Sequence, residues 1–213
     1  CTVSPLQKAR MAYAPKLPAA FKAGANVACT EGEKLAAFAD TEKITAKFPS
    51  TSNMPLLTFA PGNGEKIAKP INVAVILSGG QAPGGHNVIA GLFDGLKSLN
   101  PESRLYGFKG GPSGLTDNKY IEITADFLAA YRNTGGFDMI GSGRTKLETP
   151  EQFEKAEVNC KALGITAIVI IGGDDSNTNA CLLAEYYKAK NAGIIVVGCP
   201  KTIDGDLKNA YIE

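Results

Sequence analysis

The stretch Ile-Thr-Ala-Ile-Val-Ile-Ile-Gly-Gly-Asp-Asp-Ser, residues 165–176, joins a run of apolar, mostly β-branched side chains to two glycines and two adjacent carboxylates. The apolar run is typical of a parallel strand that is buried on both faces. Residues 177–187 then read as the start of a helix. The stretch therefore predicts a strand whose carboxyl end opens onto a helix N-terminus, which is where open α/β sheets bind ligands.

The glycines and carboxylates of this turn indicate phosphate chemistry with a metal ion. Glycines let a phosphate approach the backbone, helix N–H groups stabilise its charge, and a carboxylate can hold Mg²⁺. Two uncompensated acids would repel an anion, so the pattern calls for a metal or a lysine nearby. Asp174, Asp175 and Ser176 could instead only cap the helix, but capping leaves the two preceding glycines unexplained.

Strand and helix patterns alternate from residue 71 onward. Strands are predicted at residues 71–77, 104–108, 137–140, 166–171 and 193–198, and helices at residues 87–99, 125–133, 150–163 and 178–191. Repeated strand–helix units joined by right-handed crossovers give a sheet with mostly parallel strands. The sequence thus predicts an α/β fold, a doubly wound, Rossmann-like sheet with helices on both faces.

Residues 1–70 differ in composition and are interpreted as an N-terminal extension to an α/β domain at residues 71–213. They hold seven of the 12 prolines but only four of the 24 glycines. Within this extension we predict a helix around residues 31–39 or somewhat beyond.

The bulk composition excludes several classes of function. The 213 residues are 44% apolar and carry a formal net charge of +1. This near-neutral balance argues against nucleic-acid binding, and no apolar run approaches the roughly 20 residues that span a bilayer. The five cysteines form no CxxC pair, and the first residues do not resemble a secretory signal. A reduced, cytoplasmic location is therefore expected.

Two further turns follow predicted strands and carry polar groups. Residues 78–87, Ser-Gly-Gly-Gln-Ala-Pro-Gly-Gly-His-Asn, lie where a phosphate-cradling loop would lie, although tight turns alone could require these glycines. Residues 198–207 offer Lys201 as a point charge for phosphate and Thr202 as a hydroxyl. A solvated turn is the alternative for the second segment.

Arg144 and His86 are weaker candidates. Arg144 follows a predicted strand in Gly-Ser-Gly-Arg-Thr-Lys, residues 141–146, and could fork onto a phosphate, but an ordinary surface arginine fits nearly as well. His86 is interpreted as a structural residue at a helix start and not as a base.

Taken together, the segments 78–87, 172–176 and Pro-Lys-Thr-Ile-Asp-Gly-Asp at 200–206 resemble the phosphofructokinase family. The resemblance covers residues 71–213 and is closest to the family's long, pyrophosphate-dependent type, which Ser-Pro-Leu-Gln at residues 4–7 also resembles. It implies reversible phosphate transfer from pyrophosphate to the 1-hydroxyl of fructose 6-phosphate, with Mg²⁺ as cofactor.

The resemblance also implies a role for each matched residue. Asp204 matches the general base, and Asp174 matches the aspartate associated with Mg²⁺. The implied substrate-binding residues are Gly79, Gly80, Arg144, Ser176, Thr202, Asp204 and Asp206.

Asp175 and Lys201 are implied to be catalytic and to select the phosphate donor. ATP-dependent members usually have glycine where Asp175 stands, which leaves room for the α-phosphate of a nucleotide. A carboxylate adds bulk and a repulsion of about 4 kcal/mol at about 4 Å, for an effective dielectric constant of about 20. Lys201 can stabilise charge on the transferring and departing groups.

The family's sugar-phosphate site needs residues downstream of this chain, so the implied partners are the remainder of the same enzyme and other subunits of a homo- or hetero-oligomer. No nucleic-acid or membrane partner is expected. An ATP-dependent phosphofructokinase, a non-catalytic regulatory subunit and a lipid or NAD kinase-like domain remain as alternatives. The presence of Asp174, Lys201 and Asp204 disfavours a non-catalytic regulatory subunit. Residues 200–206 disfavour a lipid or NAD kinase-like domain.

Overall fold

The computed structural model describes residues 3–21, 26–37, 39–63 and 65–205. Its centre is a six-stranded sheet in the order β5-β4-β3-β7-β8, with β6 paired to the end of β3. These strands are β3 (Asn72–Ser78), β4 (Arg104–Phe108), β5 (Tyr120–Glu122), β6 (Ser142–Gly143), β7 (Ile165–Gly172) and β8 (Ile195–Pro200). All pairings are parallel except that of β4 with β5. The predicted doubly wound, mostly parallel α/β sheet is confirmed.

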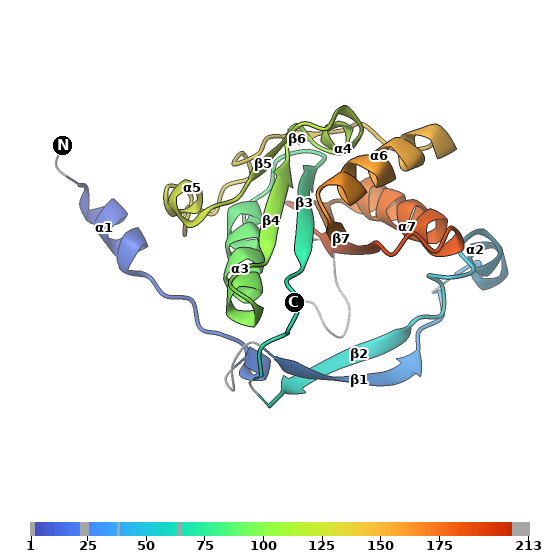
Figure 1. Ribbon diagram of the computed structural model, residues 1–213, viewed down its shortest axis with the longest axis horizontal. Coiled ribbons are helices and arrows are strands. Elements are labelled where there is room, and N and C mark those ends of the chain that lie inside the picture. Colours follow the sequence, from blue (N-terminus) through green and yellow to red (C-terminus); the bar gives the residue numbers. More distant parts are fainter. Residues whose placement is uncertain (1–2, 22–25, 38, 64, 206–213) are drawn as a thin grey trace.

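Helices cover both faces of this sheet (Figure 1). One face carries α3 (Gly85–Leu99) and α5 (Ala125–Ala129), and the other carries α4 (Ser113–Asp117), α6 (Pro150–Ala162) and α7 (Asp174–Ala189). Successive side chains of β3 point to opposite faces of the sheet and so divide the core into two clusters. Val73, Val75 and Leu77 join the apolar cluster under α3, whereas Ala74 and Ile76 join the cluster under α6 and α7.

The order of the strands places a ligand-binding edge at the ends of β3 and β7. From β3 the chain winds to β4 on one side, and later to β7 and β8 on the other side. Leu77 pairs with Ile171, so the two strands end side by side. This reversal of winding is the topological switch point at which open α/β sheets bind ligands.

Two predicted elements are wrong, and one predicted helix begins earlier than expected. Residues 31–34 belong to β1 (Val27–Lys34), which pairs antiparallel with β2 (Pro55–Pro61), and the nearby helix is α2 (Thr41–Lys47). Phe137, Met139 and Ile140 are buried but form no strand; β6 takes the place beside β3. Helix α7 begins at Asp174 and not at residue 178, so Asp174, Asp175 and Ser176 form its first turn.

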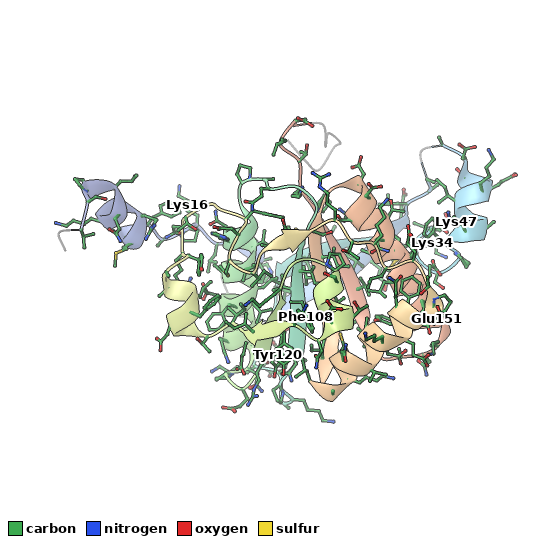
Figure 2. The ribbon with its side chains drawn as sticks, turned by 90° about the horizontal axis from the view of Figure 1, so that it is seen from above. Lys16, Lys34, Lys47, Phe108, Tyr120 and Glu151 are labelled. Atoms are coloured by element: carbon green, nitrogen blue, oxygen red, sulfur yellow. The ribbon has the colours of Figure 1, made fainter. Side chains whose placement is uncertain are left out.

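The extension lies along the outside of the α/β domain. It begins with α1 (Pro5–Ala12) and the short helix η1 (Ala19–Phe21). Figure 2 shows Lys16 on the arm at one side of the molecule and Lys34 and Lys47 at the other, with Phe108 and Tyr120 between them. Within the described ranges, no helix has the length and apolarity to cross a membrane.

Candidate functional site

The turn after β3 meets α7 and the end of β8 at Gly79. Gly79 has a φ of +85°, which glycine adopts without strain. A Cβ atom at this position would lie 3.7 Å from the Ser176 hydroxyl oxygen and 3.8 Å from Lys201 Nζ. The bare backbone of Gly79 therefore faces one hydroxyl and one ammonium group, each from a different predicted turn.

Hydrogen bonds hold these three turns in place. Ser176 Oγ donates to Ser78 Oγ at 2.8 Å, and both serines are buried. The Lys201 backbone N–H donates to the Gly172 carbonyl at 3.0 Å. The Lys201 ammonium lies 5.5 Å from the centre of the Phe137 ring, a distance that favours a cation–π contact. The hydroxyl of Ser176, predicted to bind substrate, is thus already engaged in positioning the first turn.

The loop that follows β6 forms the opposite wall. Gly79 N–H donates to the Gly143 carbonyl at 2.9 Å, and Ser142 Oγ donates to the Gly79 carbonyl at 3.0 Å. A Cβ atom at Gly80 would lie 3.1 Å from Arg144 Nη2. The structure therefore brings exposed Arg144 to the predicted donor-phosphate turn.

Asp174 and Asp175 project from the first turn of α7, and both are exposed. Lys146 Nζ lies 3.2 Å from Asp175 Oδ1. Asp174 has no ion pair within the part of the chain that the structure describes. Only one of the two adjacent acids is therefore charge-compensated by the described residues.

Asp174 could serve as a carboxylate ligand for a metal ion, because its side chain is exposed in the first turn of α7. Among residues 3–21, 26–37, 39–63 and 65–205, no cluster of three His, Cys, Asp or Glu side chains could hold an ion. Mg²⁺ commonly needs only one or two carboxylates, because substrate phosphates and water complete its coordination. The exposed Asp174 carboxylate, beside the glycine turn at Gly172 and Gly173, fits that requirement.

Thr202 and Asp204 lie in the segment that leaves β8. Thr202 is half-buried, and its hydroxyl oxygen accepts a hydrogen bond from the Asp204 backbone N–H at 3.1 Å. The Asp204 residue is exposed. Asp206 lies outside the described residues. Burial raises the pKa of the nearby Cys199 thiol, which disfavours the thiolate that a nucleophile or a metal ligand requires.

A small cavity of about 80 Å³ occupies the space between these walls. Its lining includes Ser78, Gly79, Arg144, Lys146, Asp175 and Ser176. A larger hollow of about 620 Å³ lies between α1 and residues 133–134. The walls of the smaller cavity combine cations, a helix N-terminus and bare glycine backbone, which are features that suit an anion such as phosphate.

Sequence reasoning missed Lys146 and Asn179. Lys146 stands two residues after Arg144, and its position at the end of a glycine-rich turn was the only signal for it. Asn179 is buried in α7, four residues after Asp175, and resembles an ordinary polar helix residue in the sequence.

The sequence of this chain is similar to a known protein family and to named enzymes. Residues 72–212 match the family model described as Phosphofructokinase. The chain is 61% identical over 210 residues to a pyrophosphate–fructose 6-phosphate 1-phosphotransferase of Porphyromonas gingivalis, covering 99% of this chain and 38% of the relative. It is 47% identical over 211 residues to a subunit beta 2 of the enzyme with that name in Arabidopsis thaliana, covering 98% of this chain and 37% of the relative.

A solved structure shares the fold. It is a pyrophosphate-dependent phosphofructokinase from Nitrosospira multiformis, with a TM-score of 0.58 and 24% identity, over 64% of this chain and 35% of that one. The chain thus spans well under half the length of the relatives it matches.

Proposed function

The chain belongs to the phosphofructokinase family, and from that premise we propose that it forms the phosphate-donor half of a pyrophosphate-dependent 6-phosphofructokinase. The observation that carries the proposal is the meeting of three turns at Gly79. The Ser176 hydroxyl and the Lys201 ammonium both approach the bare face of this glycine, each within 4 Å of where a Cβ atom would stand. That arrangement suits a small phosphate group, and it stands at a switch point of the sheet.

The proposed reaction moves the terminal phosphoryl group of pyrophosphate to a sugar hydroxyl. The 1-hydroxyl oxygen of fructose 6-phosphate attacks the terminal phosphorus, a new oxygen–phosphorus bond forms, and the bridging bond breaks to release phosphate. Asp204 takes the hydroxyl proton, and its exposed position leaves it open to an incoming sugar. Lys201 stabilises the charge on the transferring and departing groups, because phosphoryl transfer depends mainly on positioning and electrostatics.

Mg²⁺ is the metal that we propose for this site, held by Asp174. When bound, the ion neutralises part of the charge on the pyrophosphate oxygens. Asp174 lies in the first turn of α7, next to the turn at Gly172 and Gly173, so a metal there and the helix N–H groups can serve the same phosphate.

Pyrophosphate is favoured over ATP as the donor by Asp175 and by the names of the relatives. A carboxylate stands at the position where ATP-dependent members usually have glycine. The relatives from Porphyromonas gingivalis and Arabidopsis thaliana both carry names that specify pyrophosphate. An ATP-dependent enzyme and a non-catalytic subunit remain the alternatives, and donor rates separate all three.

The acceptor site and the assembly are proposed to involve more protein than this chain. Because the chain spans 38% of the Porphyromonas gingivalis relative, we propose that protein outside this chain, including a neighbouring subunit, completes the fructose 6-phosphate site around Asp204. A subunit name in the Arabidopsis thaliana relative supports an oligomer. A cytoplasmic location is supported by Cys29, Cys160, Cys181 and Cys199, which are all free thiols.

The test uses the full-length protein that contains this chain, assayed with fructose 6-phosphate and either pyrophosphate or ATP. We expect turnover with pyrophosphate and little with ATP. Asp204→Asn should lower kcat by roughly 10²- to 10⁴-fold, the usual contribution of a general base. Asp117→Asn, which removes an exposed carboxylate of the Lys119 ion pair, is the matched control.

Three outcomes would contradict parts of the proposal. Faster turnover with ATP would make the protein an ATP-dependent enzyme, and no turnover with either donor would favour a non-catalytic subunit. A near-normal kcat for Asp204→Asn would remove Asp204 from the role of base.

A further inference from the structure

Lys146 brings a cation to the donor cavity that neither the sequence motifs nor the proposed mechanism uses. Its Nζ atom lies 3.2 Å from Asp175 Oδ1. Both side chains line the cavity of about 80 Å³, together with Arg144 and Gly79. The Asp175 carboxylate, which is proposed to exclude nucleotides, is therefore paired with the Lys146 ammonium.

A buried amide fixes the segment that carries Lys146. Asn179 Oδ1 accepts a hydrogen bond from the Leu147 backbone N–H at 3.1 Å, and Asn179 Nδ2 donates to the Leu147 carbonyl. Asn179 is 6% exposed, so water competes little for these bonds. This pair of hydrogen bonds attaches the backbone of Leu147, the residue after Lys146, to α7.

The same helix carries Asp175 one turn earlier. Residues four apart on a helix lie on the same face, so Asp175 and Asn179 face the same loop. Asn179 holds that loop at Leu147, and Lys146 reaches Asp175 from it. Asn179 thus fixes the backbone next to Lys146 relative to the helix that carries Asp175.

The ion pair between Lys146 and Asp175 contributes little to folding stability, so its effect is expected in the electrostatics of the cavity. The side chains of Lys146 and Asp175 are 46% and 83% exposed. Exposed pairs of this kind typically contribute only about 0–1 kcal/mol to folding. An anion in the cavity, however, meets Asp175 at close range, and an uncompensated carboxylate there would repel it.

We propose that Lys146 is a donor-specificity residue: it neutralises Asp175, so that this carboxylate blocks an organic substituent on the phosphate without repelling pyrophosphate. Asn179 is the positioning residue that makes the neutralisation effective. The ligand class is an inorganic polyphosphate anion with no nucleoside attached. This inference rests on the proposed function and adds Lys146 and Asn179 to it.

The test measures KM for pyrophosphate, KM for fructose 6-phosphate and kcat in the full-length protein. Lys146→Met should raise KM for pyrophosphate by about tenfold or more, with KM for fructose 6-phosphate changed by less than about twofold and the midpoint of thermal unfolding unchanged. Lys146→Arg should retain most of the affinity. Lys119→Met removes an ion pair of similar length, 3.3 Å to Asp117, and should change none of these constants.

A double-mutant cycle tests the mechanism. In an Asp175→Asn background, Lys146→Met should change KM for pyrophosphate by less than about threefold, because the charge to be neutralised is gone. Asn179→Ala should also raise KM for pyrophosphate, and Lys146→Met combined with it should add little.

Each opposite outcome overturns the inference. An unchanged KM in Lys146→Met would show that Lys146 does not serve the donor, and an equal effect in the Asp175→Asn background would show that it does not act through Asp175. Turnover of the unaltered protein with pyrophosphate is measured first. If that turnover is absent, the proposed function fails; if it is present and the variants behave normally, only this inference fails.

Discussion

His86 is a buried residue at the start of α3 whose hydrogen bonds favour the neutral imidazole. Its Nε2 atom accepts the backbone N–H groups of Asp138 and Met139 at 3.0 and 2.9 Å, and its Nδ1 atom lies 2.6 Å from Thr134 Oγ1. The Asp138 carboxylate approaches Nε2 at 2.9 Å but is 71% exposed, so water screens it. Burial lowers the pKa of His86 and outweighs the opposing charge and hydrogen bond of Asp138.

The lowered pKa of His86 predicts a loss of stability in mild acid. The unfolded chain binds the proton more readily than the folded chain, so the stabilisation is complete above pH 6.5, the ordinary pKa, and is lost as the pH falls through the folded value. His86 is the only histidine, so NMR can follow its ring protons as a single titrating signal. We expect a midpoint below 6.5, with a matching fall in the free energy of unfolding. A midpoint at or above 6.5 would show that the Asp138 charge prevails.

Individual residues of the candidate site were predictable where a turn follows a strand. Asp174 and Asp175 follow the buried apolar strand β7, and Lys201 follows β8, whose residues are mostly exposed. Parallel strands bring such positions to one edge of the sheet. Lys146 and Asn179 were not predictable in this way. Their contact depends on how the loop after β6 folds back onto α7, and no local pattern records that.

Helix α7 serves two purposes at different points along its length. Its first turn carries Asp174, Asp175 and Ser176, and Glu185 lies further along it. The Glu185 carboxylate accepts hydrogen bonds from the backbone N–H and hydroxyl of Thr51, at 2.6 and 2.8 Å, and from the Ser50 N–H at 2.8 Å. The helix whose first turn lines the small cavity therefore also anchors the extension after α2.

Replacing Glu185 with glutamine should release this anchor. The neutral amide cannot accept all of these hydrogen bonds. A hydrogen bond to a charged group typically contributes about 1.5–3 kcal/mol to stability. Burial tends to raise the pKa of Glu185, but the bonds from Thr51 and Ser50 lower it on balance. The anchor is thus complete above pH 4.5, the ordinary pKa, and is lost as the pH falls through the lower folded value.

Amide hydrogen exchange measures the effect of Glu185→Gln directly. We expect Ser50 and Thr51 to exchange at least about tenfold faster at pH 7, since tenfold corresponds to about 1.4 kcal/mol. Glu154→Gln, at an exposed carboxylate 3.6 Å from Lys190, is the control and should leave both amides unchanged. Equal protection in the two variants would show that the extension is held by other contacts.

The elements that sequence patterns predicted well are those with strong periodicity and clear ends. The strands at β3, β4 and β7 are buried apolar runs, and their identity follows from composition alone. Residues 31–39 are rich in Glu, Lys, Leu and Ala, which favour a helix, yet residues 31–34 pair with β2. Pairing with a partner strand outweighs the weak local preference of a few residues. Residues 137–140 look like a strand because three of the four are apolar, although Gly141 has a φ of +67° and turns the chain.

At the scale of the whole molecule, the N-terminal extension runs along the outside of the α/β domain and is attached to it at separated points (Figure 1). Besides the Glu185 anchor, Asn133 Nδ2 donates to the carbonyls of Arg10 and Tyr13, both at 2.9 Å. Between α1 and η1, residues 13–18 form no regular secondary structure, and Lys16 is exposed there. The buried clusters consist of residues from the α/β domain, so the extension adds contacts at the surface and leaves the core unchanged.

This arrangement predicts where a protease cuts the 213-residue chain first. Proteases need an extended, exposed backbone, and the segment around Lys16 offers one without the unfolding of a helix or a sheet. Limited digestion with trypsin should therefore remove residues 1–16 before it cuts after Lys155, which is also exposed but lies within α6. Mass spectrometry of the early products identifies the first cut. The remaining fragment should keep its unfolding midpoint, because the two buried clusters stay intact. Early cleavage after Lys155 would show that the segment around Lys16 is not the more accessible site. A large fall in the midpoint would show that the extension supports the core and is not merely attached to its surface.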